Sequence, residues 1–330
     1  MRPGRGSRPR TRRRPAHEDA AEAFVAAVDR GRYTCVVEGR EAAGQRGGGR
    51  DVTAMRAREL GRRSVVVGDT VSLAGDASGD RGTLARIVRV APRKSVLRRS
   101  ADDTDPVERV IVANAEQLGI VTALADPPPR PRLIDRFLVA AYDAGLDPLL
   151  ILTKADLARP DEILAAYTPL GVRYLVTGRP LTAASLDELR ALLAGRISVL
   201  VGHSGVGKST LVNALIPDAG RAVGAVSAVT GRGRHTSSSV VALRLPGGGW
   251  IIDTPGLRSF GLGHIAADRV VQAFPDLAEG VAGCPRNCTH LTAECALDAW
   301  VAEHDENGAL AARLDSLRRL LRSRDGGDDG

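Results

Sequence analysis

Aromatic residues are scarce in this 330-residue chain, which has two tryptophans, four tyrosines and four phenylalanines. Because 43% of the chain is still hydrophobic, we expect an aliphatic core and few surfaces on which nucleobases could stack. No apolar run reaches the roughly 18 residues of a membrane span, and the N-terminus has no apolar segment typical of a secretory signal. These absences favour a soluble cytoplasmic protein of about two or three domains.

Cysteine is rare too, with four in the chain, and three of them lie near the C-terminus. Cys284, Cys288, His290 and Cys295 fall within a dozen residues. Three cysteines and one histidine fill the four positions of a structural zinc ion, so we predict one zinc ion here rather than disulfides. The alternative is three unrelated buried cysteines. Cys35 is expected to be a small buried hydrophobe.

The charge is unbalanced toward lysine and arginine, with a formal net charge of +7. This balance favours an acidic partner such as nucleic acid. Residues 1–16 contain seven arginines and are expected to be disordered. They are either an arm that binds phosphates without sequence choice or a solvated tail. Residues 18–30 are predicted to form a short helix, so that 1–30 is an extension, and residues 325–330 a disordered tail.

Residues 31–99 have the pattern of a small β domain. Short β-branched runs alternate with glycine-rich turns, and five of them within about 65 residues suggest a closed barrel resembling an OB-fold. Such a barrel either binds nucleic acid or serves only as a structural unit. The predicted strands are Tyr33–Val37, Val52–Ala54, Ser64–Val67, Thr70–Leu73 and Leu84–Val88.

Residues 100–262 alternate between strand and helix patterns, which predicts a doubly wound α/β domain with a parallel sheet. The predicted strands are 110–112, 118–122, 149–152, 174–176 and 197–201, and the predicted helices are 133–144, 161–167 and 186–193. Residues 263–324 are expected to form a C-terminal domain around the zinc site. Its last helix should place Leu310, Leu314, Leu317 and Leu321 on one face.

The clearest motif follows the strand at 197–201 and precedes a helix predicted from Thr210 to Ile216. It matches GxxxxGK[ST], the phosphate-binding P-loop. Glycines let the loop curl around phosphates, the lysine contacts them, and the hydroxyl after it binds Mg²⁺. The predicted nucleotide contacts are Gly202, His203, Ser204, Gly205, Val206, Gly207, Lys208, Ser209 and Thr210, of which Lys208 and Ser209 are also predicted to be catalytic.

Two later stretches are expected beside the P-loop, because ligands bind beyond the carboxyl ends of the strands in such sheets. The first begins at Asp253, which should hold Mg²⁺ through water, and ends at Gly256, whose N–H should contact the γ-phosphate. The second is the polar segment 231–239, which precedes a predicted hairpin of residues 240–245 and 250–253. Its Thr236 should complete the Mg²⁺ shell, and the segment should act as a switch.

The base-selecting stretch is Thr153-Lys154-Ala155-Asp156, which is similar to the NKxD motif of GTPases. A carboxylate at Asp156 accepts hydrogen bonds from N1–H and the 2-amino group of guanine, donors that adenine lacks. The stem of Lys154 can lie along the base. Thr153 replaces the usual asparagine but can still bond to a neighbouring loop, and Thr177 lies in a second loop expected beside the base.

The order of these motifs is that of a circularly permuted GTPase, because the base-selecting stretch precedes the P-loop. Together with the barrel before it and the Cys/His cluster after it, the pattern resembles the RsgA (YjeQ) family of ribosome small-subunit-dependent GTPases. The resemblance covers about residues 32–320 and includes Val67-Gly68-Asp69, Pro92-Arg93, Ala113-Asn114, Ile134-Asp135-Arg136-Phe137-Leu138, Gly205–Ser209, Gly233–Thr236 and Asp253–Gly256.

This resemblance implies hydrolysis of GTP to GDP and phosphate, stimulated by the small (30S) ribosomal subunit, and a role in its late maturation. The expected partners are that subunit and its 16S rRNA, and the expected state is a monomer. The family's Cys/His pattern is one residue longer in two gaps, which puts tight zinc binding in question.

One position bears on the chemistry. Many GTPases have a glutamine after DxxG that orients the attacking water, and this chain has Leu257. Intrinsic hydrolysis should therefore be slow, with His235 either orienting water or only positioning its loop. Two alternatives remain, an RNA-binding chaperone with a weak nucleotide switch and a P-loop kinase or ATPase. Asp156 argues against a kinase or ATPase, because these enzymes need no carboxylate that selects guanine. Strong stimulation of turnover by small subunits would distinguish a GTPase from a chaperone.

Overall fold

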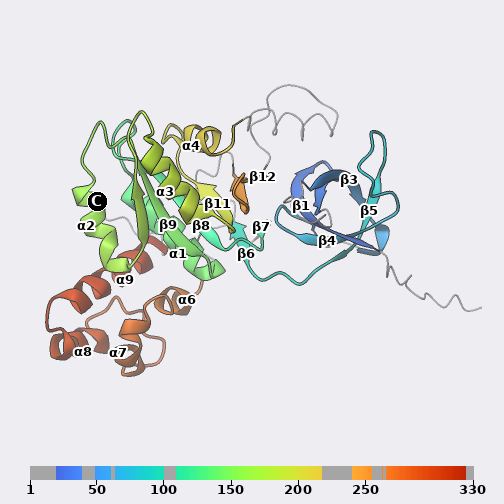
Figure 1. Ribbon diagram of the computed structural model, residues 1–330. Coiled ribbons are helices and arrows are strands. Elements are labelled where there is room, and N and C mark those ends of the chain that lie inside the picture. Colours follow the sequence, from blue (N-terminus) through green and yellow to red (C-terminus); the bar gives the residue numbers. More distant parts are fainter. Residues whose placement is uncertain are drawn as a thin grey trace, which may run out of the picture.

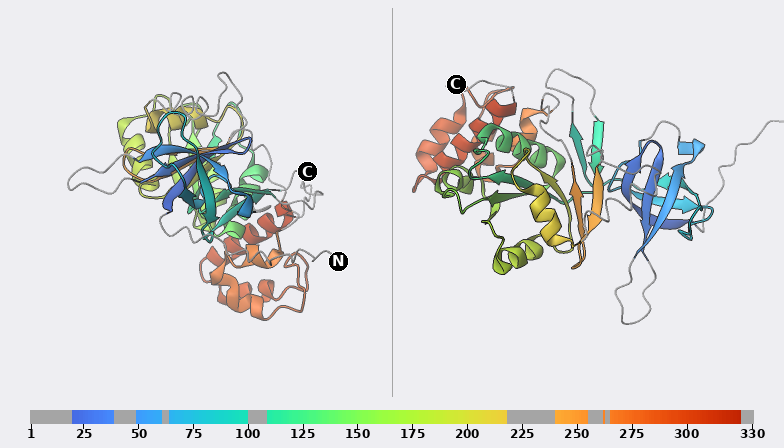
Figure 2. Two further views of the ribbon diagram at one scale, coloured as in Figure 1. Left: turned by 90° about the vertical axis from the view of Figure 1, so that its right-hand side faces the viewer. Right: turned by 90° about the horizontal axis from the view of Figure 1, so that it is seen from above.

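The computed structural model describes residues 20–38, 49–60, 64–99, 109–217, 240–254, 262 and 265–324. They form an N-terminal barrel, a central α/β domain and a group of C-terminal helices, in the order shown from blue to red in Figures 1 and 2. Within these ranges no helix is long and apolar enough to cross a membrane.

The barrel contains β1 (Ala21–Asp29), β2 (Arg32–Val37), β3 (Arg50–Arg56), β4 (Thr70–Ala74) and β5 (Ala85–Val90), with the 3-10 turn η1 (Arg58–Leu60). Its strands follow the order β1-β2-β3-β5-β4, and β4 pairs back with β1 to close the sheet. The interior is aliphatic: Val25, Val52 and Ile87 are fully buried there. The prediction of a closed, OB-like barrel is confirmed.

The helix predicted for residues 18–30 is wrong, because β1 occupies this segment. Alanine and glutamate favour a helix locally, but β1 pairs with β2 on one side and β4 on the other. The predicted strand at 64–67 is also wrong, since only Val67 forms an isolated bridge there, to Val112. The fifth barrel strand is therefore β1.

Among the described residues, the central domain has six strands in the order β10-β9-β8-β11-β13-β12, and of these only β12 is antiparallel to its neighbour. They are β8 (Gln117–Ala123), β9 (Asp147–Thr153), β10 (Arg173–Val176), β11 (Ile197–Val201), β12 (Val241–Arg244) and β13 (Trp250–Asp253). The strand predicted at 110–112 lies outside this sheet, in a hairpin of β6 (Val96–Arg99) and β7 (Arg109–Ala113). The parallel sheet itself is as predicted.

Helices cover both faces of the sheet. They are α1 (Pro131–Ala144), α2 (Asp161–Tyr167), α3 (Ala183–Leu193) and α4 (Lys208–Leu215), with the 3-10 turn η2 (Thr168–Leu170). Side chains on the two faces of β9 belong to different cores: Leu149 packs with α3 and α4, and Leu150 with α1 and α2. Burial on both faces is the reason these strands are nearly continuous apolar runs.

The C-terminal helices pack onto α1 and α2. They are α6 (Ala267–Val271), α7 (Ala278–Ala282), α8 (Ala296–His304) and α9 (Ala309–Arg324), with the 3-10 turn η3 (Pro275–Leu277). Leu314, Leu317 and Leu321 of α9 are buried in the core that also contains Leu138 of α1, which confirms the predicted apolar face.

An ion pair fixes α9 against the central domain. The Arg319 guanidinium lies 3.1 Å from a carboxylate oxygen of Asp135 and 4.7 Å from the ring centre of Tyr167. Burial raises the pKa of the Asp135 carboxyl, and Arg319 opposes that rise. Asp135 belongs to α1, which starts beside the P-loop, so the C-terminal helices are connected to the nucleotide side of the sheet.

Candidate functional site

The P-loop leaves β11 at the carboxyl edge of the sheet and enters α4. Gly202 is needed there because a Cβ at this position would lie only 2.4 Å from the carbonyl oxygen of Val121. Gly205 and Gly207 both have positive φ angles, 82° and 95°, which other residues rarely adopt. Val206 between them is buried, whereas Ser204 is exposed. The backbone thus curls as the sequence motif predicts.

Lys208 stands at the start of α4 with its side chain 13% exposed. Its Nζ donates to Oδ1 of Asp253 at 2.8 Å and to the carbonyl oxygen of Thr254 at 3.2 Å. Asp253 ends β13, which runs parallel to β11, so the two motifs meet at one edge. Ser209 and Thr210 follow Lys208 and are exposed.

Thr153 joins the stretch 153–156 to the P-loop. Its hydroxyl donates to the carbonyl oxygen of Val206 at 2.6 Å, although the two residues are 53 positions apart. The replacement of the usual asparagine therefore keeps a bond to the neighbouring loop, as predicted. Lys154 follows with a φ of 59°, and its Nζ donates to the carbonyl oxygen of Asp126.

Asp156 lies between the ends of β9 and β10. Its Oδ1 accepts from the backbone N–H of Arg179 at 2.7 Å, and Ala155 N–H donates to the carbonyl oxygen of Thr177 at 3.0 Å. Gly178 is close by, since a Cβ there would lie 3.5 Å from Oδ1 of Asp156. Within the described part of the chain, Oδ2 of Asp156 has no hydrogen-bond partner, so a ligand can use it.

Some predicted site residues lie outside the described ranges. They are His235 and Thr236 of the polar segment, Gly256, and the neighbouring Leu257. The described residues bring together the P-loop, the stretch 153–156, Thr177 and Asp253.

The proline run at 127–129 belongs to none of the predicted motifs, but it lies beside the P-loop. A Cβ on Gly205 would lie 3.5 Å from Cδ of Pro127, and Asp126 accepts the bond from Lys154. The run follows β8, the neighbour of β11 in the sheet. Since parallel strands end at the same edge, knowing the strand order would have identified this loop as part of the site.

The Cys/His cluster forms as predicted in spite of its short gaps. The potential ligand atoms of all four residues lie within 4.8 Å of one another. Sγ of Cys284 is 3.7 Å from Sγ of Cys295, and each of these sulfurs is 3.6 Å from Nδ1 of His290. Burial lowers the pKa of His290, which favours the neutral imidazole that binds metals. The cluster could hold a metal ion.

Arg318 holds this cluster against the helices. Its Nε donates to the carbonyl oxygen of His290 at 3.0 Å, and its two Nη atoms each lie 2.7 Å from a carboxylate oxygen of Asp298. Arg318 belongs to α9 and Asp298 to α8, so one side chain joins the loop to both helices. Such supporting bonds orient ligands in metal sites.

Comparison with known proteins identifies the family. The model of the RsgA GTPase family matches residues 90–263. The "Small ribosomal subunit biogenesis GTPase RsgA" of Pseudomonas aeruginosa is 39% identical over 268 residues, which are 79% of this chain and 76% of the relative. The protein with the same name from Chromohalobacter salexigens is 40% identical over 265 residues, 78% of this chain and 74% of the relative. The chain belongs to the RsgA GTPase family.

Solved structures share this architecture. YjeQ from Thermotoga maritima superposes with a TM-score of 0.64 at 23% identity, covering 91% of this chain and 98% of that one. The structure described as YloQ, a circularly permuted GTPase, gives the same TM-score at 22% identity, covering 92% and 96%. In this RsgA family member, β9, which leads into residues 153–156, precedes the P-loop strand β11. The protein is thus a GTP hydrolase of the ribosome-biogenesis class.

Proposed function

We propose that this protein is a GTPase whose turnover is stimulated by the small ribosomal subunit and which acts in late maturation of that subunit. The binding of GTP is supported mainly by the position of Asp156. Its carboxylate accepts a hydrogen bond from Arg179, and Thr153 in the same stretch bonds to Val206 of the P-loop. The curated relatives are named small ribosomal subunit biogenesis GTPases, which supports the partner. The excess of positive charge fits binding to 16S rRNA in the cytoplasm.

The proposed roles of the nucleotide-site residues follow from their chemistry. Lys208 exchanges its present partner, Asp253, for the β- and γ-phosphates. Ser209 and Thr236 supply hydroxyl ligands for Mg²⁺, and Asp253 holds the ion through water. Bound Mg²⁺ neutralises charge that develops on the phosphates. Gly256 contributes a backbone N–H at the γ-phosphate.

Hydrolysis also needs an oriented water molecule. Leu257 cannot hydrogen-bond, so we assign this task to His235 and expect the isolated protein to be slow. The arrangement of the chain supports coupling to the partner, because the segment that begins at Asp253 leads directly into α6 and the C-terminal helices. We propose a monomer with domains at 31–99, 100–262 and 263–324, with β1 extending the first domain to Ala21.

Small subunits are expected to raise GTP turnover of the parental protein at least tenfold, and this stimulation should fall as salt rises. Turnover measured with and without purified subunits, at several salt concentrations, tests the proposed function. His235→Ala should lower the stimulated rate much more than GTP affinity, since orienting water matters only in the transition state. His304→Ala, on α8, is the control variant.

The two measurements distinguish the role of His235 from the function of the whole protein. Equal stimulation in the parent and His235→Ala would limit His235 to positioning its loop. A parent that binds GTP and RNA but is not stimulated at any salt concentration would favour an RNA-binding chaperone with a weak nucleotide switch.

We further propose that the metal of the Cys/His cluster is zinc. Zinc binds sulfur at about 2.3 Å and nitrogen at about 2.0 Å, so a tetrahedral site has S···S edges of about 3.8 Å and S···N edges of about 3.5 Å. The corresponding distances among Cys284, His290 and Cys295 are 3.7 and 3.6 Å, which agree with a tetrahedron. The shortened gaps therefore do not distort the three positions that these distances define.

Metal analysis of the purified protein should find about one zinc ion per chain, and Cys288→Ala should lose it, because only three ligands remain. GDP affinity should stay near the parental value, since Cys288 is remote from the P-loop in sequence and lies in the C-terminal helical part. Cys35→Ala, which removes a cysteine buried inside the barrel, is the matched control and should keep the metal. Metal-free parental protein with full helix content would contradict the assignment.

A further inference from the structure

Three short segments, Val67–Asp69, Pro92–Arg93 and Ala113–Asn114, meet at one joint. Asp69 is fully buried and accepts from Nε and Nη2 of Arg93 at 2.7 and 2.9 Å. Gly68 permits a close approach of two backbones, because a Cβ there would lie 2.0 Å from the carbonyl oxygen of Ala113. A buried ion pair and a glycine contact are costly to assemble, so this geometry is specified closely.

The joint fixes the residues that lead into β6. The Asn114 side chain donates to the carbonyl oxygen of Gly68 at 2.8 Å and accepts from the Lys94 N–H at 2.8 Å. Asn114 N–H donates to the carbonyl oxygen of Ser95 at 2.9 Å, and the Ser95 hydroxyl donates to Ala115. Lys94 and Ser95 are therefore held by Asn114 and Ala115, and Asn114 is itself tied to Gly68.

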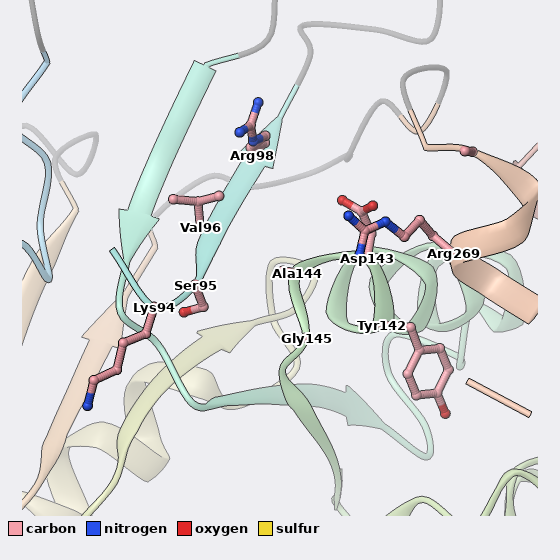
Figure 3. A pocket seen from close by; sticks show the side chains of 10 residues that line it. Lys94, Ser95, Val96, Arg98, Tyr142, Asp143, Ala144, Gly145 and Arg269 are labelled. Atoms are coloured by element: carbon pink, nitrogen blue, oxygen red, sulfur yellow. The ribbon is translucent and has the colours of Figure 1, made fainter. Parts of the chain in front are cut away.

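Lys94 and Ser95 form one wall of an open cleft of about 550 Å³. The opposite wall is the end of α1, from Tyr142 to Gly145, together with Arg269 of α6. Figure 3 shows Lys94 and Arg98 on the β6 side and Asp143 and Arg269 on the other. The cleft thus lies between the connection to the barrel, the central domain and the first C-terminal helix.

Among the described residues that line the cleft, Lys94, Arg98 and Arg269 are basic and Asp143 is the one acidic residue. Among the described residues, neither Lys94 nor Arg269 has an ion-pair partner. The one aromatic ring, Tyr142, packs against the main core instead of offering a stacking surface. Phosphates are recognised by such cations, whereas bases need stacking or matched polar groups, so the lining fits a nucleic-acid backbone.

We propose that this cleft is a docking site for the phosphodiester backbone of RNA. Because its walls come from three parts of the chain, bound RNA holds the connection to the barrel, the central domain and α6 in one arrangement. Only a short segment of sequence separates the Asp253–Gly256 motif from Arg269. The position of α6 therefore limits the positions that this motif can take. The identity of the RNA as part of the small subunit rests on the proposed function, whereas docking of RNA in the cleft does not.

The test is binding of a fluorescein-labelled 12-nucleotide oligouridylate to the full chain with GDP bound, followed by anisotropy from 50 to 300 mM KCl. Each phosphate contact to a single strand contributes about 0.7 to the slope of log K against log salt concentration. Lys94→Ala/Arg269→Ala should lower that slope by about 1.4 and weaken binding on the order of 20-fold at 0.1 M salt. Arg159→Ala/Arg190→Ala removes two exposed arginines elsewhere and should change binding little.

Asp143→Asn provides a test in the opposite direction, which misfolding cannot imitate. Removing the Asp143 carboxylate, the one carboxylate among the described lining residues, should tighten binding several-fold. Equal losses in the two double variants, or no gain in Asp143→Asn, would overturn the proposal. If inorganic phosphate competes with the oligouridylate and the salt slope of the variants is unchanged, the cleft is a site for free anions instead. If the RNA-binding results overturn the proposal but small subunits still stimulate GTP turnover of the parental protein, the proposed function stands.

Discussion

Replacing Asp156 by asparagine is expected to lower GTP affinity on the order of 100-fold and to abolish the preference for GTP over ATP. The carboxylate accepts from two adjacent donors of guanine, and hydrogen bonds to a charged group contribute about 1.5–3 kcal/mol each. The N–H₂ group of asparagine is a donor, so it cannot bond to the two donors of guanine. It can donate to the carbonyl oxygen at position 2 of xanthine. Xanthosine triphosphate should therefore become the better ligand.

The substitution is conservative for the loop itself. Oδ1 of asparagine can still accept from the backbone N–H of Arg179, which is 2.7 Å from Oδ1 of Asp156. Competition of GTP, ATP and xanthosine triphosphate against a fluorescent guanine nucleotide measures the effect. Asp161→Asn makes the same chemical change at an exposed position of α2 and should leave the selectivity intact. Unchanged GTP selectivity in Asp156→Asn would remove this residue from the base site.

Lys208→Ala is expected to reduce GTP hydrolysis at least about 100-fold, because it removes the cation that compensates charge on the transferring phosphoryl group. The structure adds a second consequence. Lys208 Nζ donates to Asp253 and to the carbonyl oxygen of Thr254, so the alanine variant also removes the partner of a carboxylate at the proposed Mg²⁺ position. Single-turnover hydrolysis with saturating small subunits measures the loss.

Ser209→Ala separates the metal from the phosphate. This exposed hydroxyl in the first turn of α4 is the proposed Mg²⁺ ligand, so its loss should shift the Mg²⁺ concentration needed for hydrolysis. Arg190→Ala removes an exposed positive charge on α3 and is the control for Lys208→Ala. Parental rates in both Lys208→Ala and Ser209→Ala would show that the P-loop is not the catalytic phosphate site.

The barrel shows how local patterns and pairing can disagree. Five strands were predicted and the described residues form five, but one predicted strand, residues 64–67, is outside the barrel and β1 replaces it. The segment 21–29 is rich in alanine, and alanine favours helix when no partner is considered. In the barrel the same small side chains allow close packing, and Val25 at the centre of β1 is fully buried.

The junction between the barrel and the central sheet could not be predicted either. Ala27 of β1 pairs with Val241 of β12, which makes one sheet out of two domains. Beside this pair the rings of Phe24 and Trp250 stack with their centres 4.5 Å apart, using two of the chain's few aromatic residues. The contact joins positions more than 200 residues apart, and no local pattern contains that information.

The sequence by itself determined which chemical groups the proposed sites contain. A P-loop motif, the carboxylate of Asp156 and a Cys₃His set are each encoded within a few residues, because close spacing along the backbone fixes which groups can surround one ligand. It also determined the order of the motifs, and hence the permuted GTPase fold.

Only the tertiary structure decided how distant segments support those motifs. The bond from Thr153 to Val206, the contact of Pro127 with the P-loop and the pairing of Arg93 with Asp69 all depend on which strands are neighbours. Strand order is set by packing and hydrogen bonding over the whole sheet, and burial makes each of these contacts strong. A linear sequence lists the same side chains but does not say which of them share one edge of a sheet or one cleft.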